Sequence, residues 1–311
     1  MTNGLMVVAG LVALVIGAEM LVRAGTSLAS WLGIRPMVIG LTVVSLGTSV
    51  PELAIGIDAA VSGSPGLAVG NIVGTNLVNL LLILGLSAAL VPIALDRATL
   101  RSDLPAMTAA ALLLFLVAID GTLTRLDGTI LLLGALAYTA GLLQVSHRET
   151  ADPAEAPAAS VAAAADCHRP LRQVLLMLVA LAVVVIGADL FVDGAVSSAR
   201  SLGVSDAIIG LTIVAVGTSA PELVATVVST LRGERDLAIG NLIGSSIYNI
   251  GAVLALTALV APHDIPVPDE VLAADLWLLV LATAAAVPVF LSGSRITRIE
   301  AGCSLRATSA T

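Results

Sequence analysis

GTSVPE, residues 47–52, lies inside a run of apolar residues that is long enough to cross a bilayer. The segment returns as GTSAPE at residues 217–222, again inside an apolar run. A carboxylate at bilayer depth is costly unless it faces water, other protein groups or an ion. Because the chain carries this carboxylate twice, each time beside a helix-breaking proline, the pair of segments predicts an ion-binding site within a membrane.

The composition of the whole chain indicates an all-α membrane protein. Of its 311 residues, 58% are hydrophobic and only 12% are charged, which is more apolar surface than a soluble domain could bury. The net charge of −8 leaves no basic stripe, so nucleic acid is excluded as a partner. The lipid bilayer is the expected surrounding, and the chain is expected to be a monomer.

Nine membrane spans are predicted from the apolar runs and the charged or Gly/Pro breaks between them. They cover residues 4–30, 36–61, 66–92, 103–119, 128–146, 171–199, 205–231, 236–261 and 270–291. No basic residue precedes the first run, so we expect a retained span and not a cleaved signal peptide. The second, third, seventh and eighth runs contain Gly, Pro, Ser, Thr and Asn, which indicates interrupted helices.

The two halves of the chain are copies of each other. A shift of 170 positions aligns residues 17–92 with 187–262 without a gap, and roughly two in five aligned positions are identical. Because five spans separate equivalent points, the second copy is expected to cross the membrane in the opposite sense, as is typical of secondary transporters. The predicted organisation is a first repeat of five helices at 1–147, a flexible linker at 148–170, a second repeat of four helices at 171–294 and a polar tail at 295–311.

The arginine distribution predicts how the chain is oriented in the cell membrane. With the N-terminus outside, only Arg125 and Arg200 fall on the outer side, and Arg23 lies within the first run. The linker and the C-terminal tail are then cytoplasmic. The tail is too short and polar to cross, so the tenth span that the symmetry requires is expected to be missing.

Both repeated segments supply oxygen atoms at bilayer depth. Pro51 removes the helical partner of the Gly47 carbonyl, and Pro221 does the same to Gly217. Hydroxyl and carboxylate groups lie within about one helical turn of each freed carbonyl. Oxygen donors without Cys or His favour hard cations such as Ca²⁺, Na⁺ or Mg²⁺. The predicted donors are Thr48, Ser49 and Glu52 in the first copy and Thr218, Ser219 and Glu222 in the second.

Two duplicated asparagines extend this set of oxygen donors. Asn79 and Asn249 each follow a hydroxyl, Thr75 or Ser245, by four residues, which places amide and hydroxyl on one helix face. A structural interpretation stays open for the asparagines, because buried amides also join membrane helices. It stays open as well for Glu19 and Asp189, a further duplicated pair that could belong to an ion path.

These motifs resemble those of the cation/Ca²⁺ antiporter superfamily, in particular the prokaryotic sodium/calcium exchangers. The two GTS-x-PE segments, with GNIVGTNLVN at 70–79 and GNLIGSSIYN at 240–249, are similar to the alpha-repeats of that family, and the resemblance covers residues 4–302. It implies an inverted-repeat helical bundle with Glu52 and Glu222 as central Ca²⁺ ligands. The other implied ligands are the carbonyls of Ser45 and Ala215, the hydroxyl or backbone oxygens of Thr48, Ser49, Thr218 and Ser219, the hydroxyls of Thr75 and Ser245, and the amide of Asn79.

The resemblance has two departures. Asn249 occupies a position that is acidic in some members, including the potassium-dependent branch, and this argues against K⁺ co-transport. The last helix of the family is expected to be absent. Its absence would lower the stability of the helical bundle but would leave the matched ligands in place.

The predicted function is a secondary antiporter that exchanges Na⁺ for Ca²⁺ by alternating access at a mid-membrane site, with no cofactor. The alternatives are H⁺/Ca²⁺ exchange at the same site and, from another class, a cation channel. An enzyme is not expected, because His147, His168 and His263 fall in loops and no span carries a nucleophile with a base.

Overall fold

The computed structural model describes residues 2–91, 93–94, 99–151, 170–204, 213, 215–293 and 295–296. Within these ranges the chain is helical apart from short connections and two-residue strands. Strand β1 (Ile93–Ala94) pairs antiparallel with β4 (Arg295–Ile296), and β2 (Thr122–Leu123) pairs antiparallel with β3 (Ile265–Pro266). The candidate membrane-spanning segments are therefore all helical, and the described strands are two-residue pairs between the connections of these helices.

Among the described residues, seven helices are long and apolar enough to cross a membrane, or eight if a bent pair is counted as one span. The bent pair is Pro36–Thr48 with Val50–Val61, which lies in the second predicted span. The predicted span at 205–231 is described only in part: residues 205–212 and 214 lie outside the described ranges, and Ala220–Leu231 is a shorter apolar helix. Most of the predicted linker and tail, residues 152–169 and 297–311, also lie outside them.

The start of the predicted linker differs from expectation. Helix α8 (Arg125–Ala151) continues past residue 148 and ends at Ala151, two residues before Pro153. The helix therefore extends into the first residues of the predicted linker, and residues 152–169 lie outside the described ranges.

The chain forms two compact units, and each is described here by itself. Unit 1 contains Met1–Thr48 and Leu143–Asn241, whereas unit 2 contains Ser49–Leu142 and the chain from Leu242 onward. Each unit therefore takes segments from both sequence halves. The boundary falls inside the first GTS-x-PE segment, between Thr48 and Ser49.

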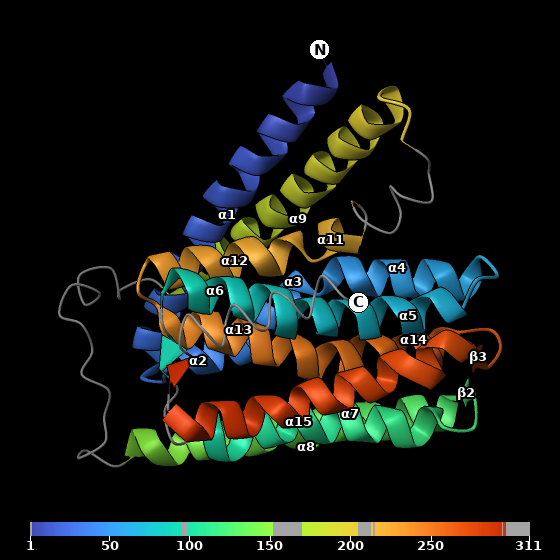
Figure 1. The fold of residues 1–311 in the computed structure, drawn as a ribbon. Helices are drawn as coiled ribbons and strands as arrows, with labels where there is room; N and C mark the ends of the chain where they lie inside the picture. Colours follow the sequence, from blue (N-terminus) through green and yellow to red (C-terminus); the bar gives the residue numbers. More distant parts are fainter. Residues whose placement is uncertain are drawn as a thin grey trace. The chain divides into compact units, whose positions relative to one another are not determined.

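Unit 1 is built around two long helices, α1 (Thr2–Leu32) and α9 (Pro170–Ser201), which lie side by side (Figure 1). They occupy equivalent positions in the two sequence repeats. Small residues allow this approach: a Cβ atom at Gly10 would lie 2.4 Å from the backbone nitrogen of Phe191. The remaining elements of the unit are shorter. They are α2 (Pro36–Ile39), η1 (Gly40–Val44), α3 (Ser45–Thr48), α11 (Ala215–Thr218), α12 (Ala220–Leu231) and the first part of α13 (Arg235–Tyr248).

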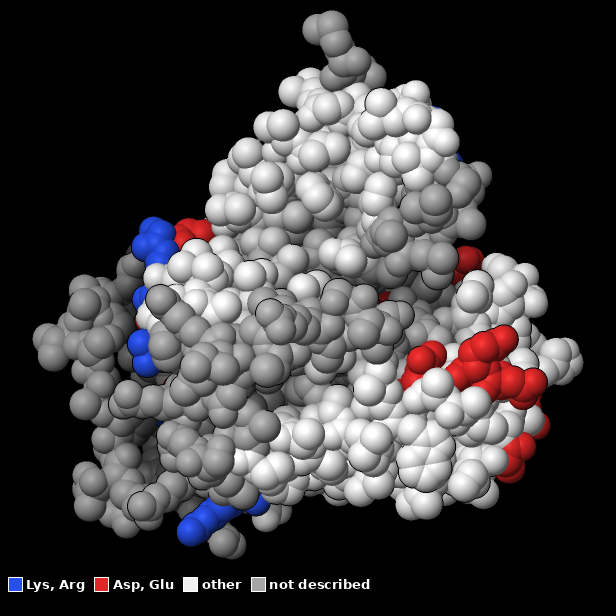
Figure 2. Space-filling model, in the orientation of Figure 1, with Lys and Arg blue, Asp and Glu red and all other residues white. Residues whose placement is uncertain are grey.

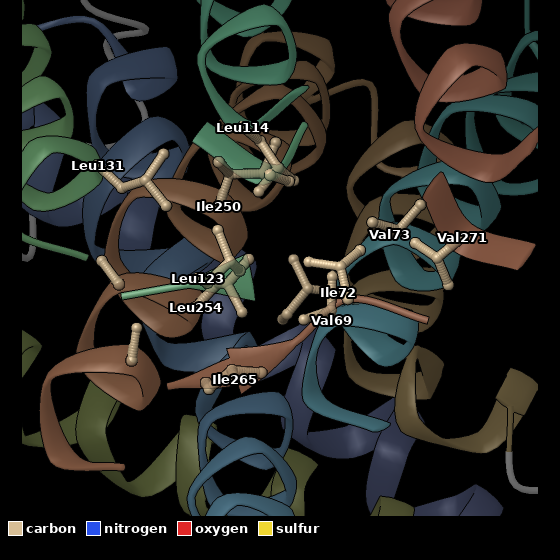
Figure 3. Close-up of a cluster of buried hydrophobic side chains, with 14 of the residues drawn as sticks. Val69, Ile72, Val73, Leu114, Leu123, Leu131, Ile250, Leu254, Ile265 and Val271 are labelled. Carbon is tan, nitrogen blue, oxygen red and sulfur yellow. The ribbon is translucent and has the colours of Figure 1, made fainter. Parts of the chain in front are cut away.

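Unit 2 holds the largest hydrophobic core. Its elements are α4 (Val50–Val61), α5 (Gly66–Leu77), η2 (Val78–Ile83), α6 (Leu84–Leu90), η3 (Thr99–Asp103), α7 (Leu104–Ala118), α8 as far as Leu142, the last part of α13, η6 (Asn249–Leu254), α14 (Ala255–Val260), η7 (Val271–Asp275) and α15 (Leu276–Gly293). Figure 3 shows Val69 and Ile72 of α5, Leu114 of α7 and Ile250 of η6 converging in this core. Burying these side chains fixes how α5 and η6, which carry candidate ligands, pack together.

Wide π-helical turns occur next to the repeated motifs. Segment η1 ends at Val44, three residues before Gly47 of the first GTS sequence, η2 contains Asn79 and η6 begins at Asn249. A π turn inserts one residue into a helix and disturbs its regular hydrogen bonding, and such turns are frequent at functional sites. The expected interruptions of the third and eighth spans are therefore present as π turns.

One end of unit 2 is acidic. Figure 2 shows acidic side chains gathered over the end of the unit where α4 finishes and β2 and β3 lie. The exposed acids of this end are Asp58, Asp120, Asp264, Asp269 and Glu270. Arg101 lies at the other end of α7, which runs from η3 towards β2.

Candidate cation site

The two GTS-x-PE segments adopt the same backbone conformation. Ser49 has φ −85° and ψ 8°, and Ser219 has φ −84° and ψ 6°. These values lie in the bridge region, which interrupts the helix between Thr48 and Val50 and between Thr218 and Ala220. Each new helix then starts with its proline in the first turn, where the missing N–H needs no partner. The interruption that the prolines predict is present in both copies.

Both carboxylates lie in the first turn after the break, and both are buried. Glu52 of α4 is 0% exposed and Glu222 of α12 is 1% exposed. The first turn of a helix carries backbone N–H groups without helical partners, so its positive end faces these carboxylates. The break in the helix thus supplies part of the stabilisation that a buried carboxylate requires.

In unit 1, the described donors come from three short elements. Ser45 and Thr48 lie on α3, Thr218 on α11, and Ser219 and Glu222 at the start of α12. All are buried except Thr218, which is half-buried. Helix α12 packs against both α3 and α11. Unit 1 therefore brings the hydroxyls of the first motif close to the helix that carries the second glutamate.

A buried chain of hydrogen bonds connects these elements of unit 1. The Ser45 hydroxyl donates to the Leu41 carbonyl at 2.8 Å. Thr48 Oγ1 lies 3.3 Å from the Ser45 carbonyl oxygen and 3.3 Å from Asn241 Oδ1. The amide nitrogen of Asn241 donates to Thr226 Oγ1 at 3.0 Å. Ala215 begins α11, and its side chain is outside the described part of the chain.

Sequence reasoning missed Asn241 and Thr226. Asn241 is the second residue of GNLIG and matches Asn71 of GNIVG, so its amide is duplicated in the same way as that of Asn249. This duplication was the signal available in the sequence. Thr226 has no such signal, because its counterpart in the first repeat is Gly56.

In unit 2, the donors lie on α4 and on two helices that change from α to π. Thr75 of α5 precedes Asn79 of η2, and Ser245 of α13 precedes Asn249 of η6. All four side chains are buried, as is Ser49 at the start of α4. Helix α4 packs against α5 and η6, and α5 packs against η6. The elements that carry Glu52, Thr75 and Asn249 are therefore mutual neighbours in this unit, and Asn79 follows α5 in the chain, on η2.

The two asparagines of unit 2 are buried with no protein partner for their amides. Asn79 and Asn249 are both 0% exposed, and within the described residues neither Oδ1 nor Nδ2 of either side chain makes a hydrogen bond. An unsatisfied buried polar group costs about 1–3 kcal/mol, so such groups in native structures require an explanation, and a bound ion is one. This favours ion binding over the structural interpretation of these amides.

The predicted site residues thus divide evenly between the units. Unit 1 holds Ser45, Thr48, Ala215, Thr218, Ser219 and Glu222, and unit 2 holds Ser49, Glu52, Thr75, Asn79, Ser245 and Asn249. Within each unit the structure brings a carboxylate together with hydroxyl groups. Unit 2 also contributes two side-chain amides, those of Asn79 and Asn249.

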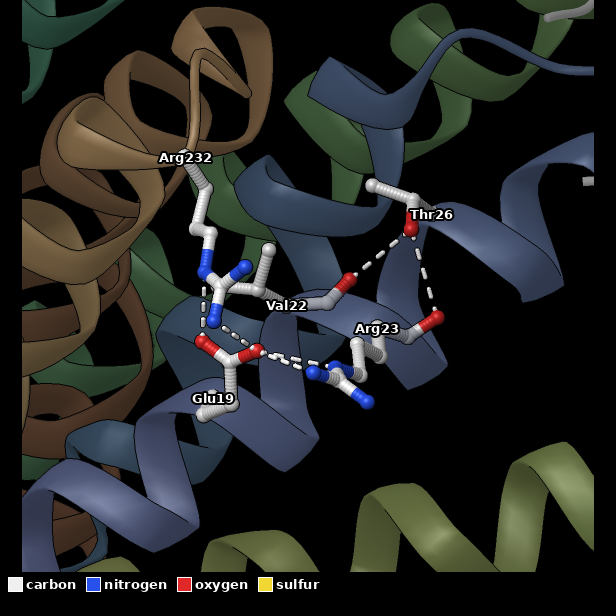
Figure 4. A network of polar contacts seen from close by, with 5 residues as sticks. All are labelled: Glu19, Val22, Arg23, Thr26 and Arg232. Carbon is white, nitrogen blue, oxygen red and sulfur yellow. Dashed lines mark hydrogen bonds and ion pairs between the residues drawn. The ribbon is translucent and has the colours of Figure 1, made fainter. Parts of the chain in front are cut away.

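Glu19 of α1 has a different environment from the two buried glutamates. Its carboxylate accepts hydrogen bonds from Arg23 at 2.8 Å and from Arg232 at 2.7 Å, and Figure 4 shows the three side chains meeting at the edge of α1. The Glu19 side chain is 22% exposed. Two guanidinium groups already balance its charge, which favours a structural role for Glu19.

A multi-span helical protein with buried carboxylates, hydroxyls and amides at broken helices belongs to the class of membrane transporters for cations. Comparison with known proteins gives the family. A family model described as "Sodium/calcium exchanger protein" matches residues 3–144 and 172–306, so the chain belongs to the sodium/calcium exchanger family. It is a transporter and not an enzyme.

Individual known proteins are similar to this chain over most of their length, which supports the family assignment. CaxA from Alkalimonas amylolytica is 39% identical over 303 residues, which cover 96% of this chain and 93% of CaxA. Inner membrane protein YrbG from Escherichia coli (strain K12) is 35% identical over 261 residues, covering 84% of this chain and 80% of YrbG. A solved structure of the sodium-calcium exchanger NCX_Mj superposes with a TM-score of 0.83 at 28% identity, covering 98% of this chain and 95% of that one.

Proposed function

We propose that this protein exchanges Na⁺ for Ca²⁺ across the cell membrane by alternating access, with Na⁺ moving inward and Ca²⁺ outward. The observation that carries the proposal is the complete burial of Glu52 and Glu222, each in the first turn after a proline break. Buried carboxylates in a membrane protein are costly unless an ion or a partner compensates them. The names of the family and of the similar exchanger NCX_Mj support Na⁺ and Ca²⁺ as the exchanged ions.

The ligands that we assign are all oxygen donors. Glu52 and Glu222 supply charge, Asn79 and Asn249 supply neutral amide oxygens, and the neighbouring hydroxyls and carbonyls complete the coordination. The complete set is Glu52, Glu222, Asn79, Asn249, Thr48, Ser49, Thr218, Ser219, Thr75 and Ser245, with the carbonyls of Ser45 and Ala215. Two carboxylates match the charge of one Ca²⁺, and the same oxygens suit Na⁺.

The proposal includes a topology of nine spans in two inverted repeats. Residues 205–231, with α12 as their second part, make the seventh span, and the N-terminus lies outside. In this orientation the acidic end of unit 2 in Figure 2 faces outward, and Arg101 of the same unit faces the cytoplasm. A cysteine-accessibility experiment on intact cells tests the orientation: single cysteines at Asp264 and Arg101 are expected to react from outside and from inside, respectively.

Transport by the purified protein in vesicles tests the proposed exchange. Vesicles loaded with Na⁺ and diluted into Na⁺-free buffer are expected to take up radioactive Ca²⁺, and this uptake is expected to be lost in Glu52→Gln and in Glu222→Gln. The matched control is Thr230→Val, because Thr230 is a buried group on the helix of Glu222 whose hydroxyl bonds only to the Thr226 carbonyl at 2.8 Å. Ca²⁺ uptake that is equally fast with and without the Na⁺ gradient would overturn the proposal.

The same vesicles distinguish H⁺ from Na⁺ as the counter-ion. A pH gradient without Na⁺ is expected to drive little Ca²⁺ uptake. Uptake driven by the pH gradient alone would replace Na⁺/Ca²⁺ exchange by H⁺/Ca²⁺ exchange, and uptake that neither saturates nor needs a counter-ion would indicate a channel.

A further inference from the structure

Asn241 uses both ends of its amide to connect two helices of unit 1. Its Oδ1 lies 3.3 Å from Thr48 Oγ1 on α3, and its Nδ2 lies 3.0 Å from Thr226 Oγ1 on α12. All three side chains are buried, at 0–1% exposure. Thr226 lies four residues after Glu222, one turn further along the same helix face. The amide thus joins a hydroxyl of the first motif to the helix of the second.

The direction of these hydrogen bonds decides what the Thr48 hydroxyl can do. The amide nitrogen of Asn241 only donates, and it is directed at Thr226 Oγ1. Its carbonyl end therefore faces Thr48, and it shares the single hydroxyl hydrogen with the Ser45 carbonyl oxygen as a second acceptor. A hydroxyl whose hydrogen points at protein acceptors offers its lone pairs on the other side. A hard cation binds those lone pairs and is repelled by the hydrogen.

We propose that Asn241 is a positioning residue for the cation site: it holds the Thr48 hydroxyl with its oxygen towards the transported ion, and Thr226 fixes the amide in that orientation. The inference rests on the proposed function, since Thr48 is one of the ligands assigned there. It adds two residues that do not themselves touch the ion.

The hydroxyl that fixes the Asn241 amide is present in only one repeat. The counterparts of Asn241 and Thr226 in the first repeat are Asn71 and Gly56. Gly56 has no hydroxyl, and a Cβ atom there would lie 2.7 Å from Thr257 Oγ1. The Asn71 amide nitrogen is buried and makes no hydrogen bond within the described part of the chain. The first repeat therefore lacks the hydroxyl that fixes the amide of Asn241 in the second.

Substitutions at Thr226 test the inference with little risk to folding. Thr226→Val keeps the shape of the side chain and removes the acceptor for the Asn241 amide, whereas Thr226→Ser keeps the hydroxyl. We expect Thr226→Val to weaken the apparent Ca²⁺ affinity about tenfold, because the Thr48 hydroxyl is no longer held in one orientation. Thr226→Ser is expected to stay near the wild type, and Thr230→Val again serves as the matched control with a hydroxyl bonded only to backbone.

Two measurements keep this inference separate from the proposed function. The first is the rise in melting temperature of the purified protein with Ca²⁺ concentration, which reports ion binding without transport. The second is Na⁺-driven Ca²⁺ exchange, where Thr226→Val is expected to raise KM and leave the maximal rate within about twofold. A Ca²⁺ affinity of Thr226→Val equal to that of Thr230→Val overturns the inference alone. Wild-type protein that binds Ca²⁺ but does not exchange it for Na⁺ overturns the proposed function alone, and wild-type protein that binds no Ca²⁺ overturns both.

Asn241→Leu provides a second variant for the same inference. It removes one of the two acceptors of the Thr48 hydroxyl, leaving only the Ser45 carbonyl oxygen of the pair, and is expected to weaken Ca²⁺ binding at least as much as Thr226→Val. Normal Ca²⁺ affinity in folded Asn241→Leu protein would overturn the role of the amide, whatever the result at Thr226.

Discussion

Gly40 and Gly240 contact each other backbone to backbone where the start of η1 crosses α13. A Cβ atom at Gly240 would lie 2.5 Å from the Met37 carbonyl oxygen, and one at Gly40 would lie 2.6 Å from the Leu237 carbonyl oxygen. Only glycine fits at such a distance. Asn241 follows Gly240 directly in the chain, so this crossing also places the amide that reaches Thr48.

Gly240→Ala is expected to destabilise the protein, because the methyl group must push two backbones apart. Overpacking of this kind costs about 1–3 kcal/mol, which a lower melting temperature in detergent would reveal. The control is Gly141→Ala on α8, where a Cβ atom meets nothing within 4 Å among the described residues. That change is expected to be neutral or slightly stabilising, since alanine favours helices over glycine. Equal melting temperatures for the two variants would contradict the crossing.

Asn79→Leu and Asn249→Leu are expected to separate folding from ion binding. Their amides make no hydrogen bond within the described residues, so leucine removes no protein contact and the ion-free melting temperature should stay the same or rise. Stabilisation by added Ca²⁺ should fall sharply. The control is Thr257→Val on α14, whose buried hydroxyl bonds to the Val253 carbonyl at 2.8 Å. Ca²⁺ stabilisation that survives in both leucine variants would return these asparagines to a structural role.

Glu19→Gln is expected to retain transport. The carboxylate is already paired with Arg23 and Arg232 and is partly exposed, so it contributes little to ion binding, and such exposed pairs add about 0–1 kcal/mol to stability. Na⁺-driven Ca²⁺ uptake should stay within about twofold of the wild type, in contrast to Glu222→Gln. Complete loss of uptake in Glu19→Gln would instead make this residue part of an ion path.

Asp127→Ala is expected to lower stability without changing ion affinity. Asp127 Oδ2 accepts hydrogen bonds from the Thr124 backbone nitrogen at 2.8 Å and from the Thr124 hydroxyl at 2.7 Å, which forms a capping box at the start of α8. Removing such a cap costs about 1 kcal/mol, measurable as a lower melting temperature. Asp264→Ala, an exposed acid at the same end of unit 2, is the control and should leave the melting temperature unchanged.

Much of the fold could be predicted from local patterns. The apolar runs gave the long helices, and the prolines of the two GTS-x-PE segments predicted breaks that the structure places at Ser49 and Ser219. These features depend on residues close together in the chain. The interaction of Asn241 with Thr48 joins residues 193 positions apart, and nothing in either segment indicates that they meet. The structural interpretation of Glu19 was open from the sequence, but its ion pair with Arg232 could not be predicted, because Arg232 comes from a distant turn.

The sequence by itself determined a helical membrane protein with a duplicated, carboxylate-bearing motif. Hydropathy, proline positions and repeat spacing can be read directly from the order of the residues. Only the tertiary structure decided how the duplicated pieces are grouped. The compact units do not follow the two repeats: each combines segments of both, and GTSVPE is divided between Thr48 and Ser49. The physical reason is that helices bury their apolar faces and close-packing glycines against whichever helices fit them, and those neighbours come from the other half of the chain.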